Sequence, residues 1–172
     1  RIEFDLNLVQ NFEYIVGIDE VGWGCIAGNL YLGAVAISKE ELKTFNQLVN
    51  TFPILSKIRD SKKLPESTRK EIYLFSTNNT LKNIEYCLGE GNLDTINNKG
   101  LVYAFEEALL SIFNQLKNKN IPLEKCLFLM DGSRVPKPLL NYNTKLVIKG
   151  DDLSLCIGWA SILAKEFRDE YM

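Results

Sequence analysis

The sequence predicts an α/β fold in which a central mixed sheet of five strands is flanked by helices. Short apolar runs rich in β-branched and aromatic residues alternate with longer stretches whose apolar residues recur at helical spacing. The 172-residue chain is 46% hydrophobic, which is enough for one core and too short for two ordinary domains. We therefore expect a single domain over residues 1–172.

Five strands and four helices are expected in the order β-β-α-α-β-α-β-β-α. The strands cover Tyr14–Ile18, Leu30–Ile37, Asn83–Leu88, Cys126–Met130 and Lys145–Ile148. The helices cover Lys39–Asn50, Glu66–Phe75, Thr95–Lys117 and Leu155–Phe167. Glycines between the first two strands predict a hairpin. Pro65 stands near the start of the second helix, and Gly100 weakens the first turns of the third.

The composition excludes several kinds of chemistry. Twenty basic and 22 acidic residues give a net charge of −2, so any basic surface for nucleic acid has to be local. The chain has no histidine, which excludes Ser-His-Asp and Cys-His nucleophiles and histidine-ligated zinc. Acid–base or metal chemistry must then rest on carboxylates, lysines, tyrosines or cysteines.

The cysteines and the apolar runs indicate a cytoplasmic protein with no membrane segment. Cys25, Cys87, Cys126 and Cys156 lie far apart and form no C-x-x-C pair, so reduced, buried thiols are expected. The sequence contains no run of about 18 apolar residues, so no membrane-spanning helix is expected. The first ten residues do not form a signal peptide.

Two adjacent acids, Asp19 and Glu20, follow the first strand and precede a glycine-rich turn. Neighbouring side chains of a regular strand point to opposite faces, so the two acids would diverge if the strand continued. Gly22 and Gly24 follow at once, and we expect the strand to bend or end there. A bend would let both carboxylates converge.

Two further acids stand in similar positions, Asp131 after CLFLM and Asp151 after LVIKG. If the strand ends gather at one edge, these carboxylates meet and repel one another, and hard cations such as Mg²⁺ or Mn²⁺ are the usual compensation. Two such ions about 4 Å apart can activate a water and stabilise a leaving oxygen in phosphodiester cleavage. Alternatively, each acid is a turn or cap residue, because spacing alone does not show convergence.

Four ordered segments resemble the ribonuclease HII family, the type 2 ribonucleases H, over nearly the whole chain. They read IVGIDEVGWGCIAGNLYLGAVAI, RDSKKLPESTRKEIY, FLMDGSRVPK and VIKGDDLSLCIGWASILAKEFRDEYM. The resemblance implies a ribonuclease H-like fold and a catalytic site in which four carboxylates hold two Mg²⁺ or Mn²⁺ ions. Matched position by position, these are Asp19, Glu20, Asp131 and Asp151, while Asp152 is expected in a helix N-terminal turn.

The resemblance also implies an activity. The protein would be a monomeric endonuclease of DNA repair that hydrolyses the RNA strand of RNA–DNA hybrids. It would also nick at ribonucleotides embedded in duplex DNA, leaving 3′-hydroxyl and 5′-phosphate ends. Asp19 would bridge both metals and Asp151 would hold the one at the attacking water. Glu20 and Asp131 would hold the ion that faces the leaving 3′-oxygen.

Substrate contacts are implied by the same resemblance. The family's glycine turn contacts the ribose 2′-hydroxyl, and here it reads Gly22-Trp23-Gly24, with tryptophan in place of arginine. Trp23 removes an ionic contact with phosphate and either stacks on a sugar or base or packs on the protein surface. The other expected substrate-contacting residues are Ser61, Lys62, Lys63, Arg134, Ser161 and Lys165.

Three other functions stay open. The chain is alternatively a non-catalytic module that binds RNA–DNA hybrids on the same fold, although all four carboxylates are present. A further alternative is another nuclease or an integrase on the same fold that acts on DNA, although the D-E-x-G and D-S-K-K-L segments count against it. Ribonuclease HIII would have an additional N-terminal domain and a G-K-G turn. The family continues past its R-D-x-x-M segment with a helical portion, and the chain ends at Met172, so that portion is expected to be missing.

Overall fold

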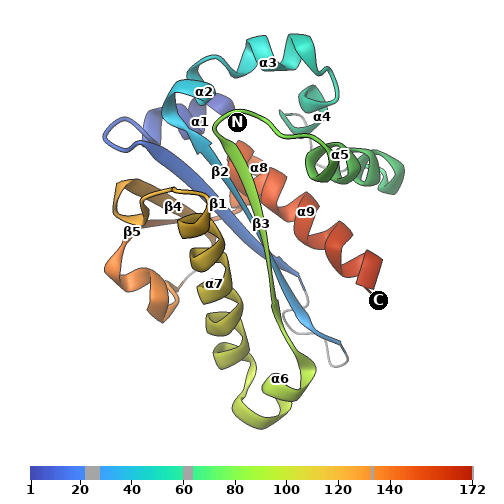
Figure 1. Cartoon of the computed structure of the whole chain (residues 1–172), viewed down its shortest axis with the longest axis vertical. Helices are drawn as coiled ribbons and strands as arrows, with labels where there is room; N and C mark the ends of the chain where they lie inside the picture. Colours follow the sequence, from blue (N-terminus) through green and yellow to red (C-terminus); the bar gives the residue numbers. More distant parts are fainter. Residues whose placement is uncertain (22–27, 60–63, 133, 172) are drawn as a thin grey trace.

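A computed structural model describes residues 1–21, 28–59, 64–132 and 134–171. Five strands form one mixed sheet in the order β3-β2-β1-β4-β5, which confirms the predicted architecture (Figure 1). Their bounds are β1 (Tyr14–Val21), β2 (Leu30–Ser38), β3 (Ile84–Gly91), β4 (Cys126–Asp131) and β5 (Asn143–Val147). The first three strands pair antiparallel, with β1 and β2 adjacent as predicted, and β4 and β5 extend the sheet in parallel.

All four predicted helices are present, but two of them are broken. The helices are α1 (Ile2–Leu8), α2 (Lys39–Lys43), α3 (Phe45–Thr51), α4 (Leu55–Arg59), α5 (Glu66–Asn78), α6 (Leu93–Lys99), α7 (Leu101–Asn118), α8 (Gly150–Leu153) and α9 (Leu155–Tyr171). Short 3-10 turns cover Leu123–Lys125 and Lys137–Asn141. The expected long helix divides into α6 and α7 at Gly100, whose φ of 94° no regular helix contains.

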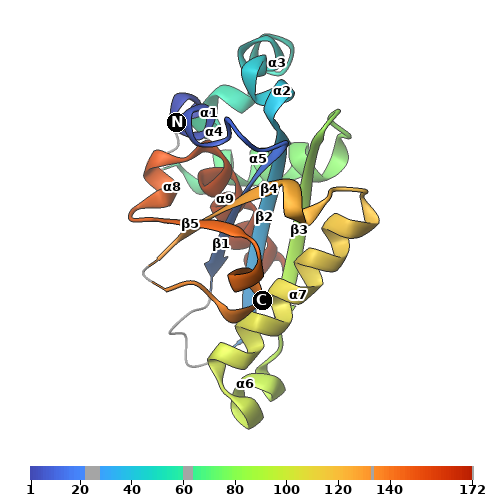
Figure 2. The ribbon, with the colours of Figure 1, turned by 90° about the vertical axis from the view of Figure 1, so that its left-hand side faces the viewer.

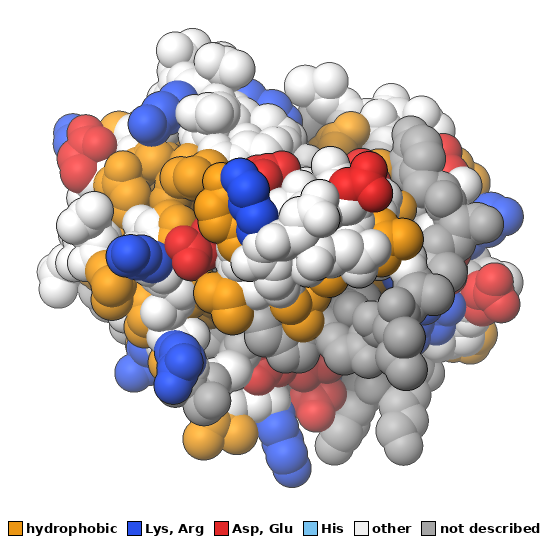
Figure 3. All heavy atoms as spheres, turned by 90° about the horizontal axis from the view of Figure 1, so that it is seen from below, with side chains coloured by type: hydrophobic (Ala, Val, Ile, Leu, Met, Phe, Trp, Pro, Cys, Tyr) orange, Lys and Arg blue, Asp and Glu red, His pale blue; other side chains and the backbone are white. Residues whose placement is uncertain are grey.

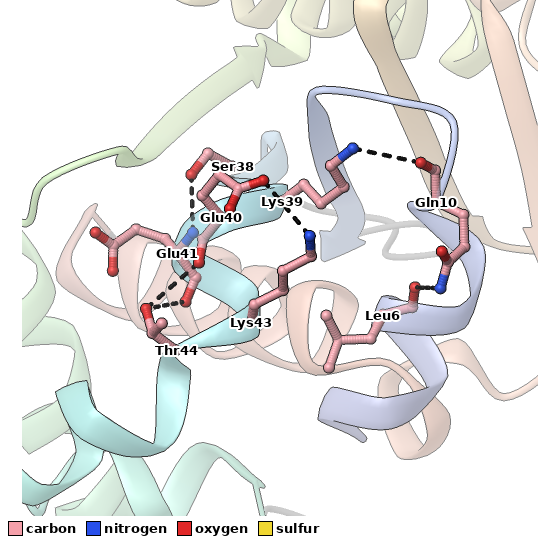
Figure 4. A network of polar contacts seen from close by, with 8 residues as sticks. All are labelled: Leu6, Gln10, Ser38, Lys39, Glu40, Glu41, Lys43 and Thr44. Atoms are coloured by element: carbon pink, nitrogen blue, oxygen red, sulfur yellow. Dashed lines mark hydrogen bonds and ion pairs between the residues drawn. The ribbon is translucent and has the colours of Figure 1, made fainter.

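Thr44 divides the first predicted helix into α2 and α3. Ser38 caps α2, since its Oγ accepts the Glu41 amide at 3.1 Å. One turn later the Thr44 hydroxyl lies 3.4 Å from the carbonyl oxygens of Glu40 and Glu41 (Figure 4). A threonine hydroxyl bonded to the preceding turn competes with continuation of the helix, which accounts for the break.

The core consists of two layers, one on each face of the sheet (Figure 2). Successive side chains of β1 alternate between them, with Ile15 in the layer that contains α9 and Val16 and Ile18 in the layer that contains α7. All three side chains are fully buried. This alternation decides toward which face each later residue of β1 points.

Two glycines allow α9 to lie almost directly on the sheet. A Cβ added at Gly17 of β1 would come within 2.3 Å of the Cys156 carbonyl carbon. At Gly33 of β2 it would come within 2.4 Å of the Ala160 carbonyl oxygen. Both obstructing groups are helix backbone, which cannot move aside as a flexible side chain can.

The start of α9 is capped from two places. Ser154 Oγ accepts the Ile157 amide at 3.2 Å, and Asp5 Oδ2 of α1 accepts the Cys156 amide at 2.9 Å. Asp5 is fully buried, and burial raises the pKa of its carboxyl from 3.8 to about 6. Hydrogen bonds from Ser154 and Cys156 lower this pKa but do not offset the burial.

The thiol predictions hold where the structure tests them. Cys87, Cys126 and Cys156 are buried and form no disulfide, and Cys25 lies outside the described residues. Burial raises the pKa of the Cys87 thiol to about 11 and that of Cys126 to about 12, so both stay protonated near neutral pH. Among the described helices, none combines the length and apolar character needed to cross a bilayer.

The close approach of α9 predicts a large effect of Gly17→Ala. The added methyl group would overlap helix backbone, so we expect a loss of about 3 kcal/mol of unfolding free energy in denaturant titrations. Gly100→Ala is the matched control, because open space surrounds that site and only its left-handed φ resists alanine. It should cost about 1–2 kcal/mol, because φ 94° with ψ 162° is a region that favours glycine. Equal effects at both positions would contradict the packing of α9 on β1.

The buried Asp5 predicts a pH-dependent term in stability. Because its folded pKa is raised, its favourable contribution is complete below about pH 4 and is lost as the pH rises through about 6. Asp5→Asn removes this pH-dependent contribution. The unfolding free energy of the variant minus that of wild type should therefore be roughly 2–3 kcal/mol higher near pH 7 than at pH 4. Denaturant unfolding of both proteins between pH 4 and 8 measures this. Two parallel stability curves would contradict it.

Candidate active site

The two adjacent acids lie inside β1 and not after a bend. Asp19 pairs with Gly33 and Glu20 with Leu32, and the strand continues to Val21. The strand therefore runs past its predicted end at Ile18 and includes both acids, and it ends at Val21, directly before Gly22. The bend expected at Gly22 and Gly24 lies outside the described residues and stays a prediction. The ladder with β2 continues past both acids, and its paired hydrogen bonds keep the backbone extended.

As a result the two carboxylates leave β1 on opposite faces. Asp19 continues the α9 side of the strand, where the Ser161 hydroxyl of α9 hydrogen-bonds to its carboxylate. Glu20 continues the α7 side and lines a cavity together with Phe105 and Glu106 of α7. The Glu20 amide also donates to Asp19 Oδ1 at 3.0 Å. The pair thus spans the thickness of the sheet at the carboxyl end of β1.

Asp131 and Asp151 approach from the neighbouring parallel strand and the helix beyond it. Asp131 is the last residue of β4, whose register with β1 reaches Ile18 opposite Met130. The backbone amides of Gly150 and Asp151, at the start of α8, hydrogen-bond to the Asp131 carboxylate. Free amides at a helix start favour an anionic acceptor, so Asp131 joins β4 to α8.

Asp151 itself lies elsewhere than the sequence suggested. The strand expected to end beside it stops at Val147, and Asp151 belongs to the first turn of α8, together with Asp152. The chain turns between strand and helix at Lys149, whose φ of 56° is left-handed. This turn directs Asp151 back toward the ends of β1 and β4.

Burial and mutual repulsion make the site unfavourable for negative charge. The pKa of Asp19 rises to about 8, first because of burial and then because of the Glu20 and Asp151 charges. The Glu20 amide and the Ser161 hydroxyl oppose this rise. The pKa of Glu20 is raised by burial and by Asp131, and that of Asp131 by burial and by Asp151. Each acid is therefore within electrostatic range of two others.

These donors fit a hard divalent cation. All four are carboxylates, the ligands that Mg²⁺ and Mn²⁺ prefer, and a cation would offset the repulsion that raises their pKa values. Over the described ranges of the chain, no three acidic or cysteine side chains stand close enough together to hold a metal ion. Two ions between them would therefore require side-chain adjustment.

A cavity of about 290 Å³ adjoins the acids on the α7 side of the sheet. Glu20 and Asp131 form one wall, and Val102, Phe105 and Arg134 contribute to the others. Figure 3 shows the molecule from the end toward which β1 runs, where acidic side chains lie near exposed hydrophobic ones. Arg134 is exposed, so its guanidinium is available to a phosphate near the carboxylates.

The remaining predicted site residues divide into three groups. Ser161 lies beside Asp19, as described above. Lys165 is exposed one turn further along α9 and takes part in no hydrogen bond or ion pair found among the described residues. The third group lies outside the described residues and comprises Gly22, Trp23, Gly24, Ser61, Lys62 and Lys63.

Two features of the structure do not follow from the sequence pattern. Phe105 and Glu106 line the cavity, whereas the apolar periodicity predicts only a helix at these positions. Asp5 lies in α1, where no helix is predicted, and its contact with Cys156 joins segments far apart in the chain.

Comparison with known proteins gives a consistent family and fold. A family model described as Ribonuclease HII matches residues 16–172. Ribonuclease HII of Ehrlichia chaffeensis is 34% identical over 174 residues, covering 99% of this chain and 73% of the relative. The chain spans 66% to 73% of the length of the first three curated relatives it matches.

Solved structures agree on the fold. The PCNA:RNase HII complex from Archaeoglobus fulgidus gives a TM-score of 0.63 at 24% identity, covering 91% of this chain and 73% of that one. Bst-RNase HIII in complex with Mn²⁺ gives 0.66 at 18% identity, covering 95% and 54%. At these identities the likeness shows the ribonuclease H-like fold alone.

The raised pKa of Asp19 predicts that Asp19→Asn stabilises the metal-free protein. In wild type, the favourable contribution of Asp19 to the unfolding free energy is complete below about pH 4 and is lost as the pH rises through about 8. The unfolding free energy of Asp19→Asn should therefore exceed that of wild type by roughly 1–3 kcal/mol at pH 9. Denaturant unfolding in the presence of a chelator measures this. Asp152→Asn, which removes an acid from the same end of the fold, should show no such trend. An Asp19→Asn protein less stable than wild type at pH 9 would contradict the electrostatic account.

Proposed function

The chain belongs to the ribonuclease HII family, and on that premise we propose that it is a metal-dependent endoribonuclease. It hydrolyses the RNA strand of RNA–DNA hybrids and nicks at ribonucleotides embedded in duplex DNA, leaving 3′-hydroxyl and 5′-phosphate ends. One observation carries the proposal. β1, β4 and α8 bring Asp19, Glu20, Asp131 and Asp151 within electrostatic range at one end of the sheet, and three of them have raised pKa values.

The four carboxylates would hold two Mg²⁺ or Mn²⁺ ions. When bound, these ions supply an activated water and stabilise the leaving 3′-oxygen. Asp19 is within electrostatic range of both Glu20 and Asp151, so it would suit a ligand shared by both ions. Asp151 would hold the ion at the attacking water, and Glu20 and Asp131 would hold the ion at the leaving oxygen. Carboxylates that are already desolvated and mutually repelled gain more from a cation than solvated ones do.

The other residues orient and bind. Ser161 donates to Asp19 and so fixes the direction in which its free oxygen points. Arg134, exposed at the edge of the cavity beside Asp131, contacts a phosphate of the bound strand. Lys165, exposed on α9, contributes positive charge on the other face of the sheet from the cavity. The net charge of −2 makes such local cations necessary for holding a polyanion.

Recognition of the ribose belongs to segments outside the described residues. In the proposal, the backbone of Gly22-Trp23-Gly24 contacts the 2′-hydroxyl, which distinguishes RNA from DNA. Ser61, Lys62 and Lys63 bind phosphates without sequence preference. Trp23 carries no charge, so its side chain stacks and does not form an ion pair. The protein acts as a monomer in the cytoplasm.

The second candidate is a hybrid-binding module without catalysis, and Asp131→Asn separates the two. The substitution removes one metal-binding charge and should lower the rate of cleavage roughly a hundredfold or more, on a duplex containing one ribonucleotide and on an RNA–DNA hybrid with Mg²⁺ or Mn²⁺. Asp152→Asn, in the same turn as Asp151, should retain the wild-type rate. Equal rates for wild type and Asp131→Asn would reject the site, and a wild type that binds without cleaving would favour the binding module.

A further inference from the structure

We propose that Asp5 of α1 is a positioning residue for the active site. Through the start of α9 it holds Asp151 and Ser161 in register with the ends of β1 and β4. The inference rests on the proposed function, because its consequence is the alignment of the carboxylates. The family match begins at residue 16 and assigns no role to α1.

Asp5 is an unusual residue to bury. Its side chain is 0% exposed, and Oδ2 accepts the Cys156 amide at 2.9 Å. The Ser154 side chain also hydrogen-bonds to the carboxyl, while Oδ1 is buried and has no hydrogen-bond partner in the described part of the chain. A buried carboxylate with one unpaired oxygen costs stability that an apolar or amide side chain would not. The partial positive charge at the start of α9 offsets part of this cost and gives the carboxylate its direction.

The contact lies midway between two site residues. Cys156 is five residues after Asp151 and five before Ser161, and Ser161 hydrogen-bonds to Asp19. The Ser154 amide donates to the Gly150 carbonyl at 2.8 Å, which couples the end of α8 to the start of α9. Arg1 donates to the backbone carbonyl of Asp151. Arg1, at the start of α1, and Asp5 within it therefore contact the first and the last residue of the 151–156 segment.

α1 is itself held firmly enough to serve as an anchor. Figure 2 shows α1 next to α8. Val9, at the end of α1, is fully buried in the α9 layer of the core. Lys39 Nζ of α2 lies 3.4 Å from the Gln10 carbonyl oxygen, and Gln10 Nε2 bonds to the Leu6 carbonyl (Figure 4). Movement of the 151–156 segment would therefore require breaking a contact with a fixed element.

The test compares Asp5→Ser with Asp5→Asn. Asparagine keeps an acceptor at the position of Oδ2, whereas the serine hydroxyl stops one atom short of the Cys156 amide. We expect Asp5→Ser to weaken Mn²⁺ binding roughly tenfold, measured by the electron paramagnetic resonance of free Mn²⁺, and to lower kcat by a similar factor while KM for the nucleic acid stays within about twofold. Asp5→Asn should restore both values, and Glu3→Ser, an exposed acid on the same helix, should match wild type.

A folded Asp5→Ser protein with wild-type Mn²⁺ affinity and kcat would overturn the inference, even if its melting temperature were lower. If that variant does not fold, Ser154→Ala removes the neighbouring cap of α9 and should weaken Mn²⁺ binding roughly threefold. Unchanged binding in Ser154→Ala would then count against the inference. If wild type binds Mn²⁺ without cleaving, the proposed function fails, while the comparison of Mn²⁺ affinities still decides the role of Asp5.

Discussion

Repulsion between carboxylates at the carboxyl ends of β1 and β4 is the constraint around which this end of the molecule is organised. Burial already disfavours the charged form of Asp19, and the charges of Glu20 and Asp151 add to that effect. The fold supplies only partial compensation, through the Ser161 hydroxyl at Asp19 and the amides of Gly150 and Asp151 at Asp131. Such an arrangement disfavours the charged form of these acids when no cation is near. In the proposed function, bound cations would offset this cost, so the site would exchange stability for metal affinity.

The rest of the architecture keeps these acids from moving apart. Asp19 and Glu20 are fixed on opposite faces because the β1–β2 ladder continues through both. Gly17 and Gly33 bring α9 against the sheet, so Ser161 reaches Asp19. The left-handed turn at Lys149 returns Asp151 toward β4. Backbone contacts, and not long flexible side chains, therefore set where these acids leave the fold. In the proposed function only their side chains would adjust to hold the ions.

Much of this could be predicted from the sequence, because strands and long helices depend on apolar periodicity. The five strands, the β1–β2 hairpin and the helices α5, α7 and α9 followed from it. The break at Gly100 and the helix α1 did not, since short helices depend on tertiary contacts such as the Asp5 cap. The four acids were identified by resemblance to a family. Their placement on two faces of the sheet was not predicted, because it depends on where the β1–β2 ladder ends.

The central claim is that acids from β1, β4 and α8 form one site for two hard cations. The most direct test is a crystal structure of the protein grown with Mn²⁺, with anomalous scattering used to locate the ions. We expect two peaks, one touching Asp19, Glu20 and Asp131 and the other touching Asp19 and Asp151. Mn²⁺ bound only elsewhere, with these four side chains turned away from one another at saturating metal, would contradict the account.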